Sequence, residues 1–297
     1  MIVLTSFKIY FCGRPYIMKK NIKESSSEIK NRKKTVIYER LLLAFLILVP
    51  PLFIFQGIDF TDMGFWLSKY ELFFTPFHDA TSALCYLSEL LGAFFQKIFP
   101  IKGILGTRIG FLIVVYTTMF FVWLTLKSYL KRIHILTGLA LGVLCIFPEM
   151  KWINYNNLTA LFYAISAYCL MLGLKTEKRG YYLLTGFFLT CNIFIRFPNI
   201  LGLSLLCVPV YHSIVNSLPW KKIATIVVAY LAGGLLAFGG MLLVVDFLGH
   251  WEVLLGFFGN FSHFAPESHS FSMLLFQLRL TKKLKINFFC FKKLNIN

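Results

Sequence analysis

The 297-residue chain carries 58% hydrophobic and only 14% charged residues, whereas soluble globular proteins carry about 25% charged residues. Its net charge of +17 is dispersed: ten of the 30 Lys and Arg lie in residues 1–40 and six in residues 279–297. The composition excludes a soluble domain, and the absence of a basic patch with interleaved aromatic residues excludes nucleic-acid binding. Several apolar runs approach the roughly 20 residues that cross a bilayer, so we predict an all-α polytopic membrane protein.

The amino-terminal part of the chain predicts a basic tail followed by one membrane span. Residues 1–39 are polar and rich in Lys and Ser, which indicates a flexible tail on the cytoplasmic side. An apolar run then extends from Arg40 to Gly57, with Pro50–Pro51 in its middle. We expect these prolines to kink the helix, which membrane helices tolerate when neighbouring groups satisfy the freed carbonyls.

An acidic stretch, Gly57–Phe65, follows this first span directly. It contains Asp59 and Asp62, three residues apart, where a helix should reach the membrane interface. An acidic side chain close to hydrocarbon costs several kcal/mol unless it is hydrated, paired or functional. The stretch is therefore the first candidate for an active centre.

The long segment after the acidic stretch, residues 58–106, predicts an outer loop with interfacial helices. It is apolar but interrupted by charges and by Pro76 and Pro100. Within it, Ala80–Phe99 has an amphipathic pattern with Glu89 among its polar positions, which is typical of an interfacial helix. The neighbours His78 and Asp79 suggest a base and its orienting group, but adjacent loop residues rarely have that geometry.

Six further spans bring the predicted total to about seven. They lie near Thr107–Leu126, Ile133–Pro148, Leu158–Leu174, Tyr181–Ile195, Asn199–Ile214 and Ile223–Asp246. Basic connections at residues 127–132, 175–179 and 219–222 alternate with connections poorer in Lys and Arg. The positive-inside rule then places the N-terminus and the basic connections in the cytoplasm of a multi-pass cell (inner) membrane protein. The same count places these ionisable residues on the outer face: Asp59, Asp62, Glu149, Arg196 and Asp246.

The carboxyl-terminal part of the chain changes character. Residues 250–269 are mixed and aromatic and predict an outer loop, and the apolar run from Ser272 is short. Residues 276–297 form a basic tail with no Gly or Pro, rich in Lys, Asn, Ile and Phe. We interpret residues 40–275 as one transmembrane domain, and this tail as the product of a frameshift or truncation of a longer protein.

This layout resembles the GT-C superfamily of glycosyltransferases that use polyprenyl-phosphate sugars. That superfamily includes the protein mannosyltransferases of glycosyltransferase family 39 and the aminoarabinose transferase of lipid A. The resemblance covers about residues 40–275 and is carried by Asp59–Leu67, the loop around Pro76, Asn154–Asn157 and Arg196–Asn199.

The resemblance implies a role for each candidate residue. An outer-loop Asp, either Asp59 or Asp62, acts as base on the hydroxyl acceptor, with Asp59 slightly favoured because it lies nearest the helix end. Arg196 at the end of a span holds the lipid phosphate, unless it is an interfacial anchor. Asn156, within Asn154–Asn157, lines the acceptor or lipid groove. Glu149 holds the acceptor or a divalent metal; no other cofactor is implied.

The expected partners are a polyprenyl-phosphate-linked sugar, a glycan, lipid or protein acceptor, and membrane lipids. A transporter or flippase of lipid-linked glycans is the alternative, but it would need polar residues at the bilayer midplane, where this sequence has almost none. An inactive fragment of the transferase is a third possibility. Seven scattered cysteines without a CxxC pair predict no disulfide framework or metal site. In the last span, we expect Gly233, Gly234, Gly239 and Gly240 to allow close helix packing.

Overall fold

The computed structural model describes residues 26–52, 54, 62–75, 78, 85–98, 104–146 and 152–256, leaving aside the side chains of 26–32, 62–63 and 146. Every regular element in this part of the chain is helical. Five helical segments are long and apolar enough to cross a membrane: Lys33–Leu52, Ile104–Leu126, Tyr155–Thr176, Phe197–Val215 and Trp220–Phe247. The prediction of an all-α polytopic membrane protein is confirmed.

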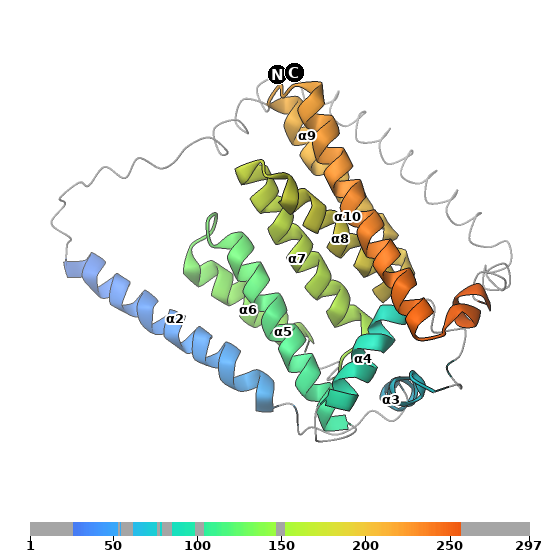
Figure 1. The fold of residues 1–297 in the computed structure, drawn as a ribbon. Helices are drawn as coiled ribbons and strands as arrows, with labels where there is room; N and C mark the ends of the chain where they lie inside the picture. Colours follow the sequence, from blue (N-terminus) through green and yellow to red (C-terminus); the bar gives the residue numbers. More distant parts are fainter. Residues whose placement is uncertain are drawn as a thin grey trace, which may run out of the picture.

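The long helices run alternately up and down in chain order (Figure 1). Seven segments correspond in order to the predicted spans: α2 (Ser26–Leu52), α5 (Ile104–Leu126), α6 (Arg132–Ile146), α7 (Tyr155–Thr176), α8 (Arg179–Ile195), η3 (Phe197–Leu206) continued by α9 (Cys207–Val215), and α10 (Trp220–Phe247). However, α6 and α8 have 15 and 17 residues, fewer than the roughly 20 that cross a bilayer. The number of spans therefore stays a prediction.

The first helix differs from its predicted bounds. Helix α2 already begins at Ser26, inside the predicted tail, and ends at Leu52, so Pro50 and Pro51 lie in its last turn rather than in its middle. Each proline lacks the N–H that would bond the carbonyl four residues earlier, so two carbonyls of the preceding turn lose their helical partner close to where α2 ends. Along its length α2 packs mainly against α6, where Arg132 Nε lies 3.7 Å from Glu39 Oε2.

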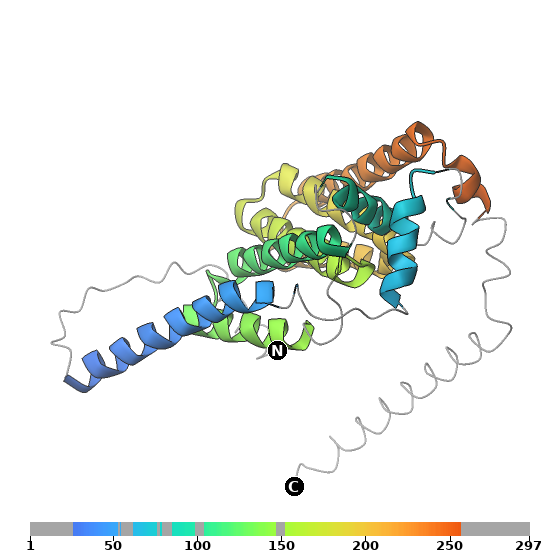
Figure 2. The same ribbon diagram turned by 90° about the horizontal axis from the view of Figure 1, so that it is seen from below.

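Two short helices occupy the segment that was predicted as a loop with interfacial helices: α3 (Asp62–Leu72) and α4 (Tyr86–Ile98). Figure 1 looks along the axis of α3 while α5, α7 and α10 run in the plane, so α3 lies across the end of the bundle, as Figure 2 also shows. We call this end of the bundle the α3–α4 end. Tyr70 of α3 is only 1% exposed and donates a 2.5 Å hydrogen bond to the carbonyl of Ile153, just before α7. This bond anchors α3 to the bundle.

Helix α4 is amphipathic, but its sides are not those that the sequence pattern indicated. Glu89, expected among the solvent-facing polar positions, is only 2% exposed, whereas Phe94 is 49% exposed. The buried side of α4 faces Tyr70 and the bundle, and Gly92 leaves the space that the Tyr70 ring fills. A pattern of apolar residues identified the helix but not the partner that buries its carboxylate.

The basic connections between helices all lie at one end of the bundle. The basic connections between α5 and α6, α7 and α8, and α9 and α10 lie at the end opposite to the α3–α4 end. Asp62, Arg196 and Asp246, which begin or end helices, lie at the α3–α4 end. The predicted grouping of these residues on one side of the membrane agrees with this arrangement.

Helices α8 and α10 make the closest contact in the bundle. A Cβ placed on Gly233 would lie 1.9 Å from the Leu183 carbonyl oxygen, and one on Gly186 would lie 1.9 Å from the Tyr230 carbonyl oxygen. The packing role predicted for Gly233 is therefore confirmed. It is wrong for Gly239 and Gly240, where a Cβ would meet no atom within 4 Å.

Candidate active site at the end of the bundle

The structure brings together two of the five predicted site residues. Arg196 and Asn156, 40 residues apart in sequence, meet where α8 ends and α7 begins, with Arg196 Nη1 3.5 Å from Asn156 Oδ1. Asp62 is the first residue of α3, and its side chain is among those not described. Asp59 and Glu149 lie outside the described residues, as do Asp79 and the predicted tail at 276–297.

Arg196 is positioned by local chain geometry. It caps the C-terminus of α8 in an extended conformation, with φ −158° and ψ 121°, and Pro198 follows at the start of η3. Its guanidinium lies over the Tyr155 ring, 5.0 Å from the centroid, in a cation–π contact. The side chain is still exposed, so its remaining N–H groups can donate to a phosphate.

A hydrogen-bonded network supports the backbone on which Arg196 lies. Asn199 Nδ2 donates to Thr159 Oγ1 at 2.8 Å and to Asn192 Oδ1 at 3.1 Å, joining η3 to α7 and α8. Asn192 is completely buried. Asn192 accepts through both its carbonyl and its Oδ1, while its Nδ2 is buried without a hydrogen-bond partner among the described residues. The bonds of Asn199 hold the start of η3 beside α7.

The asparagines at the start of α7 have two roles: Asn154 and Asn157 cap the helix, and Asn156 is accessible. The Asn154 side chain accepts from the backbone N–H of Asn156 and of Asn157, while Asn157 Oδ1 accepts from Asn154 N at 2.9 Å. This reciprocal capping box satisfies N–H groups that a helix start leaves unpaired. Asn154 and Asn157 are buried, and Asn156 is the exposed member that faces Arg196.

Helix α3 reaches the same place. The Trp66 ring lies 5.5 Å from the Tyr155 ring, which is the ring that the Arg196 guanidinium also contacts. Asp62 begins α3 about one helical turn before Trp66. On the other side of the acidic stretch, Arg108 donates from Nη1 to the carbonyl of Ile54. Ile54 and Trp66, which are described residues on either side of 55–61, thus contact Arg108 and Tyr155 respectively.

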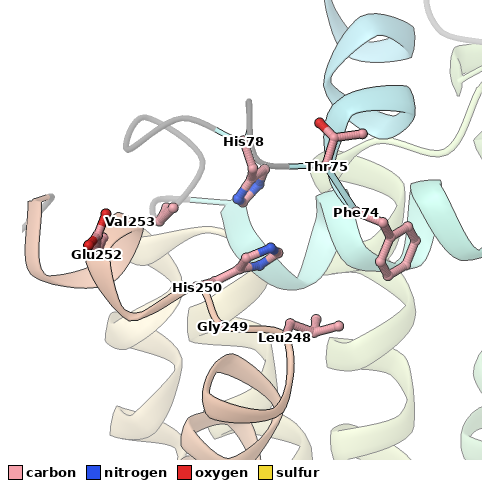
Figure 3. A pocket seen from close by; sticks show the side chains of 8 residues that line it. All are labelled: Phe74, Thr75, His78, Leu248, Gly249, His250, Glu252 and Val253. Carbon is pink, nitrogen blue, oxygen red and sulfur yellow. The ribbon is translucent and has the colours of Figure 1, made fainter.

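A second cluster, which the sequence did not reveal, joins His78, Tyr86, Glu89 and His250. His78 Nε2 lies 3.1 Å from Glu89 Oε2, and the His78 ring stacks on the His250 ring with centroids 4.6 Å apart. Tyr86 and His250 share a 3.0 Å hydrogen bond between the hydroxyl and Nδ1. The two histidines line a cavity of about 490 Å³ together with Thr75 and with residues 248–253 after α10 (Figure 3).

Burial sets the protonation states in the second cluster. It lowers the pKa of His250, with a further contribution from His78, and raises the pKa of Tyr86, with a further contribution from Glu89. The Tyr86 hydroxyl therefore keeps its proton, and it shares the hydrogen bond with a neutral His250. Burial and then Glu89 also raise the pKa of Cys85 to about 11, while Arg196 lowers it. The charges of both Glu89 and Arg196 thus act on the Cys85 thiol.

Within the part of the chain that the structure describes, no group of three or more His, Cys, Asp or Glu residues is arranged to hold a metal ion. In the second cluster, His78 already engages Glu89, and His250 engages Tyr86. These two histidines, held by hydrogen bonds, give the cavity a polar lining. A metal role for Glu149 remains a prediction.

Residues 86–244 match the family model of the dolichyl-phosphate-mannose-protein mannosyltransferases. The chain belongs to this family. No curated protein and no solved structure matches the chain. The matched region of this mannosyltransferase-family protein extends from α4 to near the end of α10 and includes Arg196, Asn156 and Glu89. Membership agrees with the resemblance inferred from the sequence and places the protein among membrane glycosyltransferases rather than transporters.

Proposed function

We propose that the protein transfers a sugar from a polyprenyl-phosphate donor to a hydroxyl group of a glycan, lipid or protein at the outer face of the cytoplasmic membrane. The family supports the donor class and the transfer reaction. The observation that carries the proposal is the meeting of α3 and Arg196 on Tyr155. Trp66 and the Arg196 guanidinium both contact this ring, and Asp62 lies about one helical turn before Trp66.

The reaction that we propose is a direct displacement with inversion. The acceptor oxygen forms a bond to the anomeric carbon of the sugar while the bond from that carbon to the phosphate oxygen breaks. Asp59 or Asp62 takes the acceptor proton, which makes the oxygen a stronger nucleophile. The electron pair of the broken bond stays on the polyprenyl phosphate, whose charge Arg196 stabilises.

Arg196 is well suited to the phosphate. Its planar guanidinium can make two parallel hydrogen bonds to phosphate oxygens, and stacking on Tyr155 holds the plane in place. Asn156, 3.5 Å away, can orient the same group or the sugar next to it. Because the leaving group is already a stable anion, no general acid is needed.

The test is sugar transfer from a polyprenyl-phosphate sugar in membranes that contain the intact protein or its Asp59→Asn and Asp62→Asn variants. Loss of the base should lower the transfer rate by about 10²- to 10⁴-fold. Asp246→Asn is the matched control, because Asp246 is an acid at the same end that accepts from Trp251 Nε1, a bond that Asn can keep. Full activity in both single variants and in the double variant would refute the assignment of the base.

A further inference from the structure

A second cavity lies between α5, α6 and α7, with a volume of about 340 Å³. Most of the side chains that line it are apolar: Val115, Met119, Val122, Leu139, Val143 and Ala160. It extends over about two turns of α5, from Val115 to Val122. We call this cavity the α5–α7 groove.

The groove exists because α6 leans on α2 and contacts α5 only weakly. Two glycines of α6, Gly138 and Gly142, face it, and a Cβ on either would meet no atom within 4 Å. Side chains at these positions would fill the space. Cys145, one turn further on, also lines the groove and is exposed, so a molecule of the bilayer can reach it.

The polarity of the groove changes along its length. Its end at the start of α7 is lined by Asn154, Asn156 and Asn157, and Asn156 is in contact with Arg196. The remainder is mostly apolar and comes from α5, α6 and α7; its one hydroxyl, that of Thr118, donates to the Val114 carbonyl within α5. A ligand that fits this gradient has one anionic end and one apolar chain.

We propose that the α5–α7 groove holds the part of the polyprenyl chain nearest to the phosphate of the donor. This inference rests on the proposed function and adds to it where the lipid lies. The groove volume is at the small end of ligand pockets, which suits one chain rather than the two chains of a bilayer phospholipid. The phosphate then lies beside Asn156 and Arg196, within reach of the acidic helix.

The kinetic test uses two donors, one with a long polyprenyl chain (the long donor) and one whose sugar phosphate carries only a methyl group in place of that chain (the short donor). Gly142→Leu and Gly138→Leu fill the groove, so the KM for the long donor should rise at least tenfold while the KM for the short donor stays within twofold. Gly239→Leu is the control, because that position is also open but lies on α10. An equal effect on both donors, or no effect on either, would overturn the proposal.

A binding test separates this proposal from the proposed function. Polyprenyl phosphate without a sugar should slow the alkylation of Cys145 at least fivefold in the intact protein, with Cys207 as the exposed internal reference. Protection of Cys145 alone supports the groove even if no sugar is transferred. Equal protection by a diacyl phosphatidic acid, or none by polyprenyl phosphate, would show that the groove is not a polyprenyl site.

Discussion

Arg196 shows how one side chain can be held and still be available. The Tyr155 ring and Asn156 fix its guanidinium, and the exposed N–H groups remain for a ligand. A lysine at this position would keep the charge but lose the planar pair of donors and most of the stacking.

We therefore expect Arg196→Lys to lower kcat/KM for the polyprenyl-phosphate sugar about 10-fold or more, and Arg196→Ala to lower it further, by about 100-fold, as expected for lost charge-assisted hydrogen bonds. The measurement is steady-state transfer in proteoliposomes. Arg179→Ala, an exposed arginine at the opposite end of α8, is the control and should retain activity. If it lost as much activity as Arg196→Ala, a general charge effect would explain both.

His250 predicts a pH dependence of stability. Its pKa is lowered in the fold by burial and then by His78, so the unfolded chain binds a proton more readily than the native state. Stability is therefore lost as the pH falls from the ordinary value of 6.5 towards the lower folded pKa. The other groups that face the ring are Tyr86 and, across the cavity, Glu252, with Glu89 behind His78.

The measurement is the unfolding temperature in detergent between pH 5 and pH 8, for the parent protein and for His250→Gln. The glutamine can still accept a hydrogen bond from Tyr86 but does not titrate. The parent should lose more stability than the variant as the pH falls. Parallel curves for the two proteins would contradict a role of His250 in this dependence.

Only part of the candidate site could be predicted from single residues. Arg196 and Asn156 stood out because polar residues at the ends of apolar runs are conspicuous. The cluster of His78, Glu89 and His250 did not, because the contact between Tyr86 and His250 joins residues 164 positions apart. No local pattern encodes such a contact; the only signals were His78, noticed with its neighbour Asp79, and Glu89, a carboxylate within an otherwise apolar helical pattern.

At the scale of helices, the contact of α8 with α10 depends on two glycines. Replacing Gly186 or Gly233 with Ala would place a methyl group against a backbone carbonyl, and a backbone cannot move aside as a flexible side chain can. We expect each variant to lose about 1–3 kcal/mol of stability.

Gly239→Ala and Gly240→Ala are the matched controls in the same helix, because their Cβ atoms would meet open space. These two should stay within about 1 kcal/mol of the parent, since alanine favours a helix slightly over glycine. Thermal unfolding in detergent measures all four. Equal losses at the four positions would contradict the role of the close contact between α8 and α10, because helix propensity alone would make each alanine variant more stable.

The boundaries of the helices were harder to predict than their order. The predicted start of the first span, Arg40, is 14 residues later than the start of α2 at Ser26. Hydropathy detects the part of a helix that lies in lipid, but polar residues can continue the same helix into water. Conversely, η3 and α9 continue one another, although Pro198 and Pro209 make that stretch look interrupted.

At the scale of the whole molecule, apolar runs and connection charges predicted the order and alternation of the long helices. These features follow from the cost of burying charge in lipid, which acts on every segment independently. The placement of α3 across the end of the bundle could not be predicted in this way. It depends on aromatic contacts such as Trp66 with Tyr155, which form only when distant segments meet.

The orientation in the membrane is a separate prediction. We expect reporters inserted at residues 128, 177 and 217 to lie in the cytoplasm, and one after Gly249 to lie outside, because basic connections favour the cytoplasmic side. Accessibility of single introduced cysteines to a membrane-impermeant maleimide in intact cells measures this. Labelling at the three basic connections but not after Gly249 would reverse the orientation and move the proposed reaction to the cytoplasmic side.

The short length of α8 has a consequence for the surrounding bilayer. Its 17 residues extend only about 26 Å, whereas a typical hydrocarbon core is about 30 Å thick. Hydrophobic mismatch of this size is relieved by local thinning of the bilayer. Since Arg196 caps this helix, we expect the headgroup layer to lie closer to the guanidinium if α8 crosses the bilayer, so that a lipid phosphate can reach it within its own leaflet.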